Sequence, residues 1–204
     1  MAKLFNYFPK TFYSNSDGNS LDTVTNIITR FGFEQSLKEN ASAFYQYEIK
    51  DGDTPEIIAH KYYDDMYRYW IILLCNQILD PQWGWPLNSQ QFADYLNDKY
   101  GTQNITGTIH HYEQTTTQYD INSQTTTTNT IQIPQSVYNS FVPLNNTYTL
   151  PTGPVSVSTV ANAINIYQYE LQQNEAKRSI NILNNTYVNE IEKELVDLMN
   201  NNGY

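Results

Sequence analysis

Histidine is the residue type in this 204-residue sequence that most often binds metal ions, and it occurs at positions 60, 110 and 111. His110 and His111 are adjacent in a segment with strand character. Because neighbouring side chains of a strand point to opposite faces, we do not expect these two to share one metal ion. His60 falls in a predicted helix whose polar residues have simpler uses. The sequence therefore predicts no zinc site.

Acidic side chains at Asp51, Asp53, Asp64 and Asp65 could be imagined as the carboxylate pair that cleaves glycosidic bonds. All four fall where a turn or a helix cap would use them, so we do not expect an acid–base pair. Cys75 lies in an apolar segment, and the sequence has no phosphate-binding glycine loop, dinucleotide fingerprint or Gly-x-Ser-x-Gly elbow. The sequence predicts a protein with no enzymatic activity, no cofactor and no small-molecule substrate.

The elements that would position these residues are clearest in the centre of the chain. Residues 47–50 alternate apolar and polar side chains, which predicts a half-buried strand, and residues 51–53 favour a turn. Thr54 can cap a helix that begins at Pro55, where the missing N–H of proline is harmless. The helix should end before Asp64.

Two apolar surfaces follow from this central pattern. Ile57, Ile58 and Tyr62 are spaced to form one face of the first helix. Residues 67–75 are apolar all round, yet they are too few to cross a bilayer, which needs about 20 apolar residues. We expect a second, buried helix there.

This order of strand, turn and two helices resembles the LysM module. The resemblance rests on Gly52-Asp53-Thr54, the tyrosine pair that closes the first helix, Trp70 and Asn76. A LysM module would then return through a second strand. Here residues 78–87 carry two prolines and two tryptophans instead, which disfavours a strand. The sequence departs from the LysM pattern at this point.

A wider resemblance covers nearly the whole chain. It combines an N-terminal aromatic arm, the LysM-like centre running into residues 80–86, and Asn174-Glu175-Ala176-Lys177-Arg178-Ser179-Ile180-Asn181-Ile182-Leu183 before a final amphipathic helix. Together these features resemble the LysM-containing baseplate wedge subunit of contractile-tailed, T-even-type bacteriophages. The resemblance implies a structural protein that joins neighbouring wedges into a sixfold ring around the tail hub. Its implied partners are other wedge subunits, including wedge-core and sheath-initiator proteins, and its implied place is the virion, after assembly in the host cytoplasm.

The alternative is a LysM-type protein that binds N-acetylated glycans of peptidoglycan. Gly52-Asp53-Thr54 and the helix pair support it. The missing second strand, the lack of an export signal at the N-terminus and the lack of an attached hydrolase count against it.

Charge and composition exclude some classes of partner. The formal net charge is −10, and none of the 11 basic residues lies between Lys99 and Lys177. Because phosphate binding depends on clustered basic side chains, we expect neither nucleic acid nor a membrane as a partner. Tyrosine occurs 18 times, and tyrosine is enriched at protein interfaces.

We expect an α+β fold in four segments. Residues 1–46 form an aromatic arm, 47–101 the LysM-like domain, 102–158 an inserted, polar, antiparallel β and loop region, and 159–204 a C-terminal helical region. Within them we expect further elements, which are listed here: an extended stretch at 21–30, two helical turns at 34–40, a helix begun by Asn88 or Ser89 and ended by Gly101, a hairpin within 107–121, a helix at 160–174, an extended stretch at 179–183, and a last helix capped by Thr186.

Apolar residues at both ends and in the aromatic loop must pack on something. The sequence leaves open whether they cover this chain's own core or a neighbouring subunit. We take seven as candidate partner-binding residues: Phe5, Phe8, Phe12, Trp83, Trp85, Leu195 and Leu198.

Overall fold

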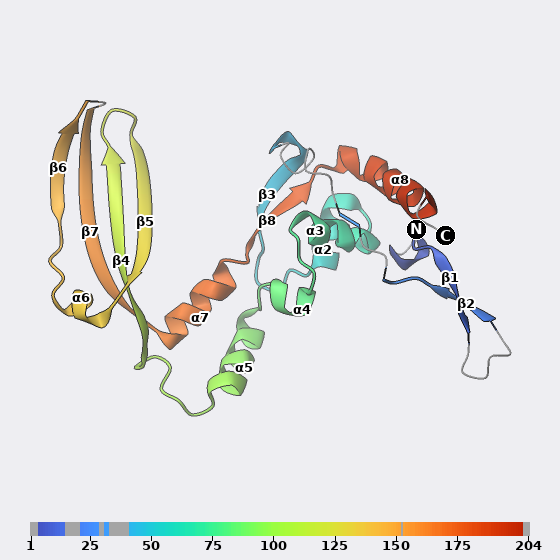
Figure 1. The fold of residues 1–204 in the computed structure, drawn as a ribbon, viewed down its shortest axis with the longest axis horizontal. Helices are drawn as coiled ribbons and strands as arrows, with labels where there is room; N and C mark the ends of the chain where they lie inside the picture. Colours follow the sequence, from blue (N-terminus) through green and yellow to red (C-terminus); the bar gives the residue numbers. More distant parts are fainter. Residues whose placement is uncertain (1–3, 15–20, 29–30, 33–40, 152, 202–204) are drawn as a thin grey trace. The chain divides into compact units, whose positions relative to one another are not determined.

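The computed structural model describes residues 4–14, 21–28, 31–32, 41–151 and 153–201. They form two compact units, each with helices and antiparallel strands (Figure 1). Unit 1 comprises residues 1–90 and 176–204, and unit 2 comprises residues 91–175. The fold is therefore α+β, as expected. The division into four segments remains a prediction.

Unit 1 contains short helices and strands and one long helix, α8. They are η1 (Leu4–Asn6), β1 (Lys10–Ser14), β2 (Leu21–Thr25), η2 (Ala41–Ala43), β3 (Phe44–Glu48), α2 (Pro55–Tyr63), η3 (Met66–Arg68), α3 (Tyr69–Cys75), α4 (Pro81–Gly84), β8 (Ser179–Leu183) and α8 (Asn185–Asn201). Strands β1 and β2 pair with each other, and β3 pairs with β8. The predicted helical turns at 34–40 lie outside the described residues.

Helix α2 begins and ends as predicted. The Thr54 hydroxyl accepts a hydrogen bond from the Ile57 amide at 3.3 Å, and Asp64 follows the helix with a left-handed φ of 55°. The predicted apolar face is right for Ile58 and wrong for Ile57 and Tyr62, which are exposed. Ile58 and Tyr63 are buried, whereas Ile57 is 50% exposed. The core lies one position further round the helix because β8 and α8 pack there.

The strand that pairs with β3 comes from near the C-terminal end of the sequence. Strand β8 pairs with β3 in antiparallel register from Phe44–Leu183 to Glu48–Ser179. Asn76, which follows α3, reinforces this strand, because its side chain donates to the Asn181 carbonyl and accepts from the Asn181 amide, both at 2.8 Å. Residues 78–87 form no strand, as predicted, and β3 pairs instead with a strand that follows unit 2 in the sequence.

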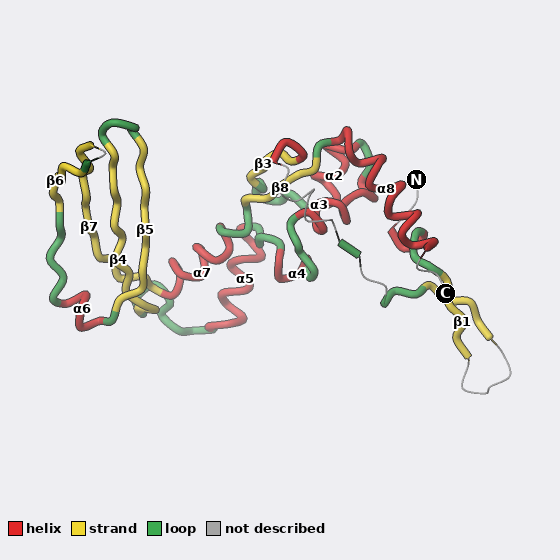
Figure 2. The backbone as a smooth tube through the Cα atoms, turned by 45° about the horizontal axis from the view of Figure 1, so that its top comes forward, coloured by secondary structure: helices red, strands yellow, loops and turns green. Residues whose placement is uncertain are grey.

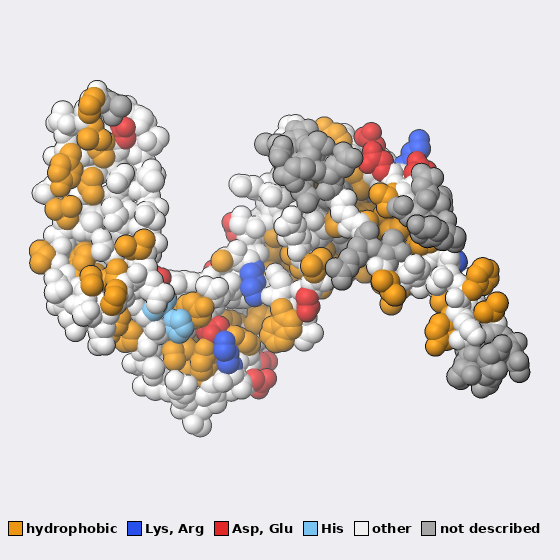
Figure 3. All heavy atoms as spheres, in the orientation of Figure 1, with side chains coloured by type: hydrophobic (Ala, Val, Ile, Leu, Met, Phe, Trp, Pro, Cys, Tyr) orange, Lys and Arg blue, Asp and Glu red, His pale blue; other side chains and the backbone are white. Residues whose placement is uncertain are grey.

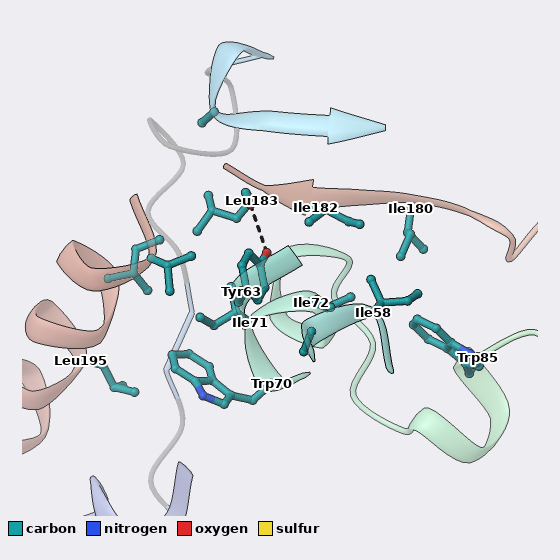
Figure 4. Packing of buried hydrophobic residues seen from close by; sticks show 14 of the residues in the cluster. Ile58, Tyr63, Trp70, Ile71, Ile72, Trp85, Ile180, Ile182, Leu183 and Leu195 are labelled. Atoms are coloured by element: carbon teal, nitrogen blue, oxygen red, sulfur yellow. Dashed lines mark hydrogen bonds between the residues drawn. The ribbon is translucent and has the colours of Figure 1, made fainter. Parts of the chain in front are cut away.

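The core of unit 1 lies between this two-stranded sheet and the helices. Ile58 of α2, Ile71 and Ile72 of α3, and Ile182 and Leu183 of β8 are almost wholly buried (Figure 4). In addition, the Tyr63 hydroxyl donates to the Leu183 carbonyl at 3.1 Å. Sequence-distant strands and helices thus share one core.

Helix α8 joins this core through one apolar stripe. Val188, Leu195 and Met199 are buried. Its start differs from the prediction, because the Asn184 side chain, and not that of Thr186, caps the helix by accepting a hydrogen bond from the Thr186 amide at 3.1 Å. Glu192 lies on the same side of the helix, next to this stripe, and its partly buried carboxylate forms a salt bridge with Arg68 at 2.8 Å.

Unit 2 is an open antiparallel sheet with helices at one end (Figure 2). Its elements are α5 (Ser89–Tyr100, which begins at the edge of unit 1), β4 (Ile109–Asp120), β5 (Thr125–Ile133), α6 (Gln135–Asn139), β6 (Asn145–Leu150), β7 (Gly153–Asn165) and α7 (Ile166–Glu175). The strand order is β5-β4-β7-β6. Gly101, with φ of 57°, follows α5 as predicted.

Two expectations for unit 2 are wrong. Residues 109–120 form one long strand, β4, and not a hairpin, because they pair along their length with β5 and β7. Residues 160–165 belong to β7, so the helix α7 begins only at Ile166. Cross-strand pairing with β4 outweighs the helical spacing of Ile164, Tyr167 and Leu171.

Candidate assembly surfaces

The turn at residues 51–53 is covered by the segment that precedes α5. The Asp51 carboxylate accepts hydrogen bonds from the Ser89 amide at 3.0 Å and hydroxyl at 2.9 Å. The Trp85 indole donates to the Asp53 carbonyl at 2.9 Å, and the Tyr47 hydroxyl donates to the Asp53 carboxylate at 2.7 Å. Both carboxylates therefore hold the turn in place.

Asp64, Asp65 and Cys75 also have structural explanations. Asp65 accepts a hydrogen bond from the Tyr67 amide at 2.9 Å, and Asp64 ends α2. Desolvation by burial raises the pKa of the Cys75 thiol to about 12, which keeps it protonated at neutral pH and poorly nucleophilic. None of these groups forms a nucleophile–base pair in the part of unit 1 that is described.

His110 and His111 lie together, contrary to the expectation that they point apart. The register of β4 with β7 shifts between Ile109 and His111, and this irregularity brings the two Nδ1 atoms to 2.8 Å. The other ring nitrogen of His111 is 2.8 Å from the Glu113 carboxylate, and the His110 ring stacks on Tyr169 at 3.9 Å. Among the described residues, no three His, Cys, Asp or Glu side chains are placed so that they could hold one metal ion. The contacts make a hydrogen-bonded chain from Glu113 to His110.

Glu170 is the buried carboxylate that joins α7 to α5 within unit 2. It accepts hydrogen bonds from Tyr95, Lys99 and Tyr100 at 3.0, 2.8 and 2.6 Å. Burial alone would raise its pKa, but hydrogen bonds from Lys99, Tyr100 and Tyr95 outweigh that effect and lower the pKa below the ordinary value. The charge is fully paired, which is typical of a structural contact.

The hairpin of β1 and β2 exposes apolar side chains on both faces. Phe12 is 75% and Leu21 69% exposed, and the pairing of Phe12 with Thr23 and of Ser14 with Leu21 makes them diagonal neighbours on one face. Tyr13 and Val24 are the corresponding exposed pair on the other face. A two-stranded hairpin is at best marginally stable in water, so this one has apolar surface available for a partner.

The sheet of unit 2 also exposes apolar side chains. Tyr148 and Leu150 of the edge strand β6 are 45% and 49% exposed. Val155 and Val157 lie on the same face of the neighbouring strand β7, and apolar side chains gather over these two strands (Figure 3). The structure therefore offers two candidate surfaces for protein contacts, one in each unit.

The model of the family described as "Base plate wedge protein 53" matches residues 3–198, which is nearly the whole chain. The chain belongs to this family. It is a structural wedge protein of a bacteriophage tail baseplate.

A curated relative supports this assignment. The baseplate wedge protein gp53 of Enterobacteria phage T4 is 30% identical over 93 residues, which are 44% of this chain and 47% of that protein. The alignment thus spans about half the length of the relative. In this wedge protein, no helix among the described residues is long and apolar enough to span a bilayer.

The seven candidate contact residues of the wedge protein divide into two groups. Phe8, Trp85 and Leu195 are buried, so their contacts in this structure are with their own chain. Phe5, Phe12, Trp83 and Leu198 are exposed, and contact with a partner remains a prediction for all seven residues. Phe8 packs on Phe31, which in turn meets Trp70.

Leu21, Tyr148 and Leu150 were not predicted from the sequence as contact residues. All three lie in short strands whose partner strands decide which face each side chain occupies. The alternation of apolar and polar residues in Asn145–Leu150 was the signal that could have indicated an edge strand.

Proposed function

We propose that this chain joins neighbouring wedges during assembly of a sixfold baseplate around the tail hub. The family match over residues 3–198 carries the proposal. The exposed apolar residues of the hairpin and of β6 support it, since exposed apolar surface is characteristic of proteins that assemble with others. Wedge-core and sheath-initiator proteins are the proposed contacts, and assembly takes place in the host cytoplasm.

In this proposal, β3, α2, α3 and β8 are a LysM-like module that serves as a scaffold for protein contacts. The order of strand, two helices and antiparallel return strand supports that description. Trp85 and Ser89 cover the Asp51–Asp53 turn, which counts against glycan binding at that turn. The paired or buried state of the acidic and thiol groups described above supports a role without enzymatic activity.

The test is sedimentation of co-expressed wedge subunits with and without this chain. We expect separate wedges in its absence and joined wedges in its presence. A peptidoglycan pull-down runs as the control. Wedge sedimentation that is the same with and without the chain would contradict the proposal, and co-pelleting with cell wall would favour glycan binding.

A further inference from the structure

The outer edge of β6 is open to another strand. Strand β6 is the last strand of the sheet order β5-β4-β7-β6, with β7 as its neighbour among the described strands. Its register with β7 runs unbroken from Asn145–Ser158 to Leu150–Gly153. Its sequence, Asn-Asn-Thr-Tyr-Thr-Leu, contains no charge and no proline. Charges, prolines and bulges are the usual means by which an edge strand resists pairing, so this edge has none of them.

The side chains of β6 specify what kind of strand fits. Tyr148 and Leu150 lie on one face with Val155 and Val157, and Thr147 and Thr149 alternate onto the other face. A strand added to this edge gains most contact if it carries large apolar side chains on the first face. It needs no charged residue, because β6 offers none to pair with.

The β1–β2 hairpin has this chemistry, and no third strand pairs with it among the residues that the structure describes. Its strands have five residues each, close to the six of β6. Phe12 and Leu21 give one face of the hairpin an exposed apolar pair that can continue the face of Tyr148 and Leu150. The charged residues of its two strands are Lys10 and Asp22, which are opposite in sign. Pairing with β6 therefore brings no like charges together, although the chain as a whole carries −10.

We propose that the β1–β2 hairpin of one copy adds to the outer edge of β6 in a second copy, so that copies of this chain join head to tail. The two contacting surfaces are different, which makes the interface heterologous. Heterologous contacts form a ring when the rotation between copies closes. The inference rests on the proposed function and deepens it, because such contacts would link one wedge directly to the next.

The experiment uses the purified full chain and two single variants. Phe12→Asp places a charge on the exposed hairpin, and Tyr148→Lys places one beside the β6 edge. Thr128→Lys is the matched control, because it puts the same charge on the exposed strand β5 at the opposite edge of the same sheet. Circular dichroism checks that each variant is folded. Sedimentation velocity over a concentration series then measures self-association.

We expect the wild-type chain and Thr128→Lys to associate as concentration rises, and each of the other variants to remain monomeric alone. An equimolar mixture of Phe12→Asp and Tyr148→Lys should form dimers and nothing larger. One intact hairpin and one intact edge remain in that mixture, and they are enough for a single head-to-tail contact.

Three results would overturn the inference. They are a wild-type chain that stays monomeric throughout, a mixture that does not dimerise, and loss of association in Thr128→Lys. The proposed function is tested separately. If Tyr148→Lys still joins co-expressed wedges, the head-to-tail contact is wrong while the wedge-joining function stands; if the wild type self-associates but leaves wedges separate, the function is wrong.

Discussion

At the scale of single residues, burial decides how much a tryptophan contributes to the stability of this protein. Trp70 is buried and meets Phe31 edge to face at 6.0 Å, whereas the Trp83 side chain is 61% exposed. We expect Trp70→Ala to lower the free energy of unfolding by about 3 to 5 kcal/mol, through lost burial and the cavity left behind. Urea unfolding, followed by the fluorescence of the remaining tryptophans in unit 1, measures it.

Trp83→Ala is the control for this prediction. Its backbone carbonyl accepts the Lys177 hydrogen bond at 2.8 Å, and the substitution leaves that carbonyl in place. We expect a change within about 0.5 kcal/mol, as for most surface substitutions. Equal effects of the two substitutions would show that Trp70 contributes no more to the core than a surface residue.

Single residues also show where sequence reasoning succeeds. Thr54 and Pro55 correctly predict the start of α2, because the Thr54 hydroxyl accepts its hydrogen bond from the amide of Ile57, only three residues further along the chain. Trp83 and Trp85 could not be told apart, although they lie in one short loop. Trp85 is buried because its indole reaches the Asp53 carbonyl, and that contact exists only once the loop folds back over the turn.

At the scale of elements, the contact between helices α5 and α7 should make the stability of unit 2 depend on pH. The pKa of Glu170 is lowered in the folded chain, so the carboxylate stabilises unit 2 above its ordinary unfolded pKa of about 4.3. That stabilisation is lost as the pH falls through the lower, folded pKa. At neutral pH we expect Glu170→Gln to cost about 1.5 to 3 kcal/mol, typical of hydrogen bonds to a charged group.

Hydrogen exchange of peptides from α5 and α7 tests this prediction. Protection should fall in Glu170→Gln at neutral pH, and the difference from wild type should shrink in acid. Asp120→Asn is a suitable control, because Asp120 serves the β4–β5 turn and not the helix contact. A difference that stays constant down to low pH would show that the charge of Glu170 is irrelevant to the contact.

Elements were predictable to the extent that their signals are local. The capped helix α2, the apolar helix α3 and the extended residues 179–183 follow from patterns within a few residues. The pairing of β8 with β3 could not be predicted, because the two strands are far apart in the sequence and no pattern within either strand identifies its partner. The long strand β4 was divided in the prediction for the same reason, since its pairing with β5 and β7 is what keeps it continuous.

At the scale of the whole molecule, the main hydrophobic core is built from residues of unit 1. Every residue of the main hydrophobic cluster lies within residues 1–90 or 176–204. The segment 91–175 thus interrupts unit 1 in sequence and supplies nothing to that cluster. An insertion with its own contacts is tolerated in this way because lengthening a connection adds little closure entropy. Unit 1 should therefore fold without unit 2.

The last prediction replaces residues 91–175 with a flexible Gly/Ser linker of about 20 residues, which has a root-mean-square span of about 25 Å. We expect unit 1 to keep a cooperative urea transition by tryptophan fluorescence, because all three tryptophans and the β3–β8 pairing remain. We also expect the shortened chain to stop joining wedges, because it lacks the β6 edge. Introducing Trp70→Ala into it must abolish or weaken that transition, which shows that the fluorescence reports the native core. A shortened chain without a transition would mean that unit 1 needs unit 2 to fold, and one that still joins wedges would place the whole joining surface in unit 1.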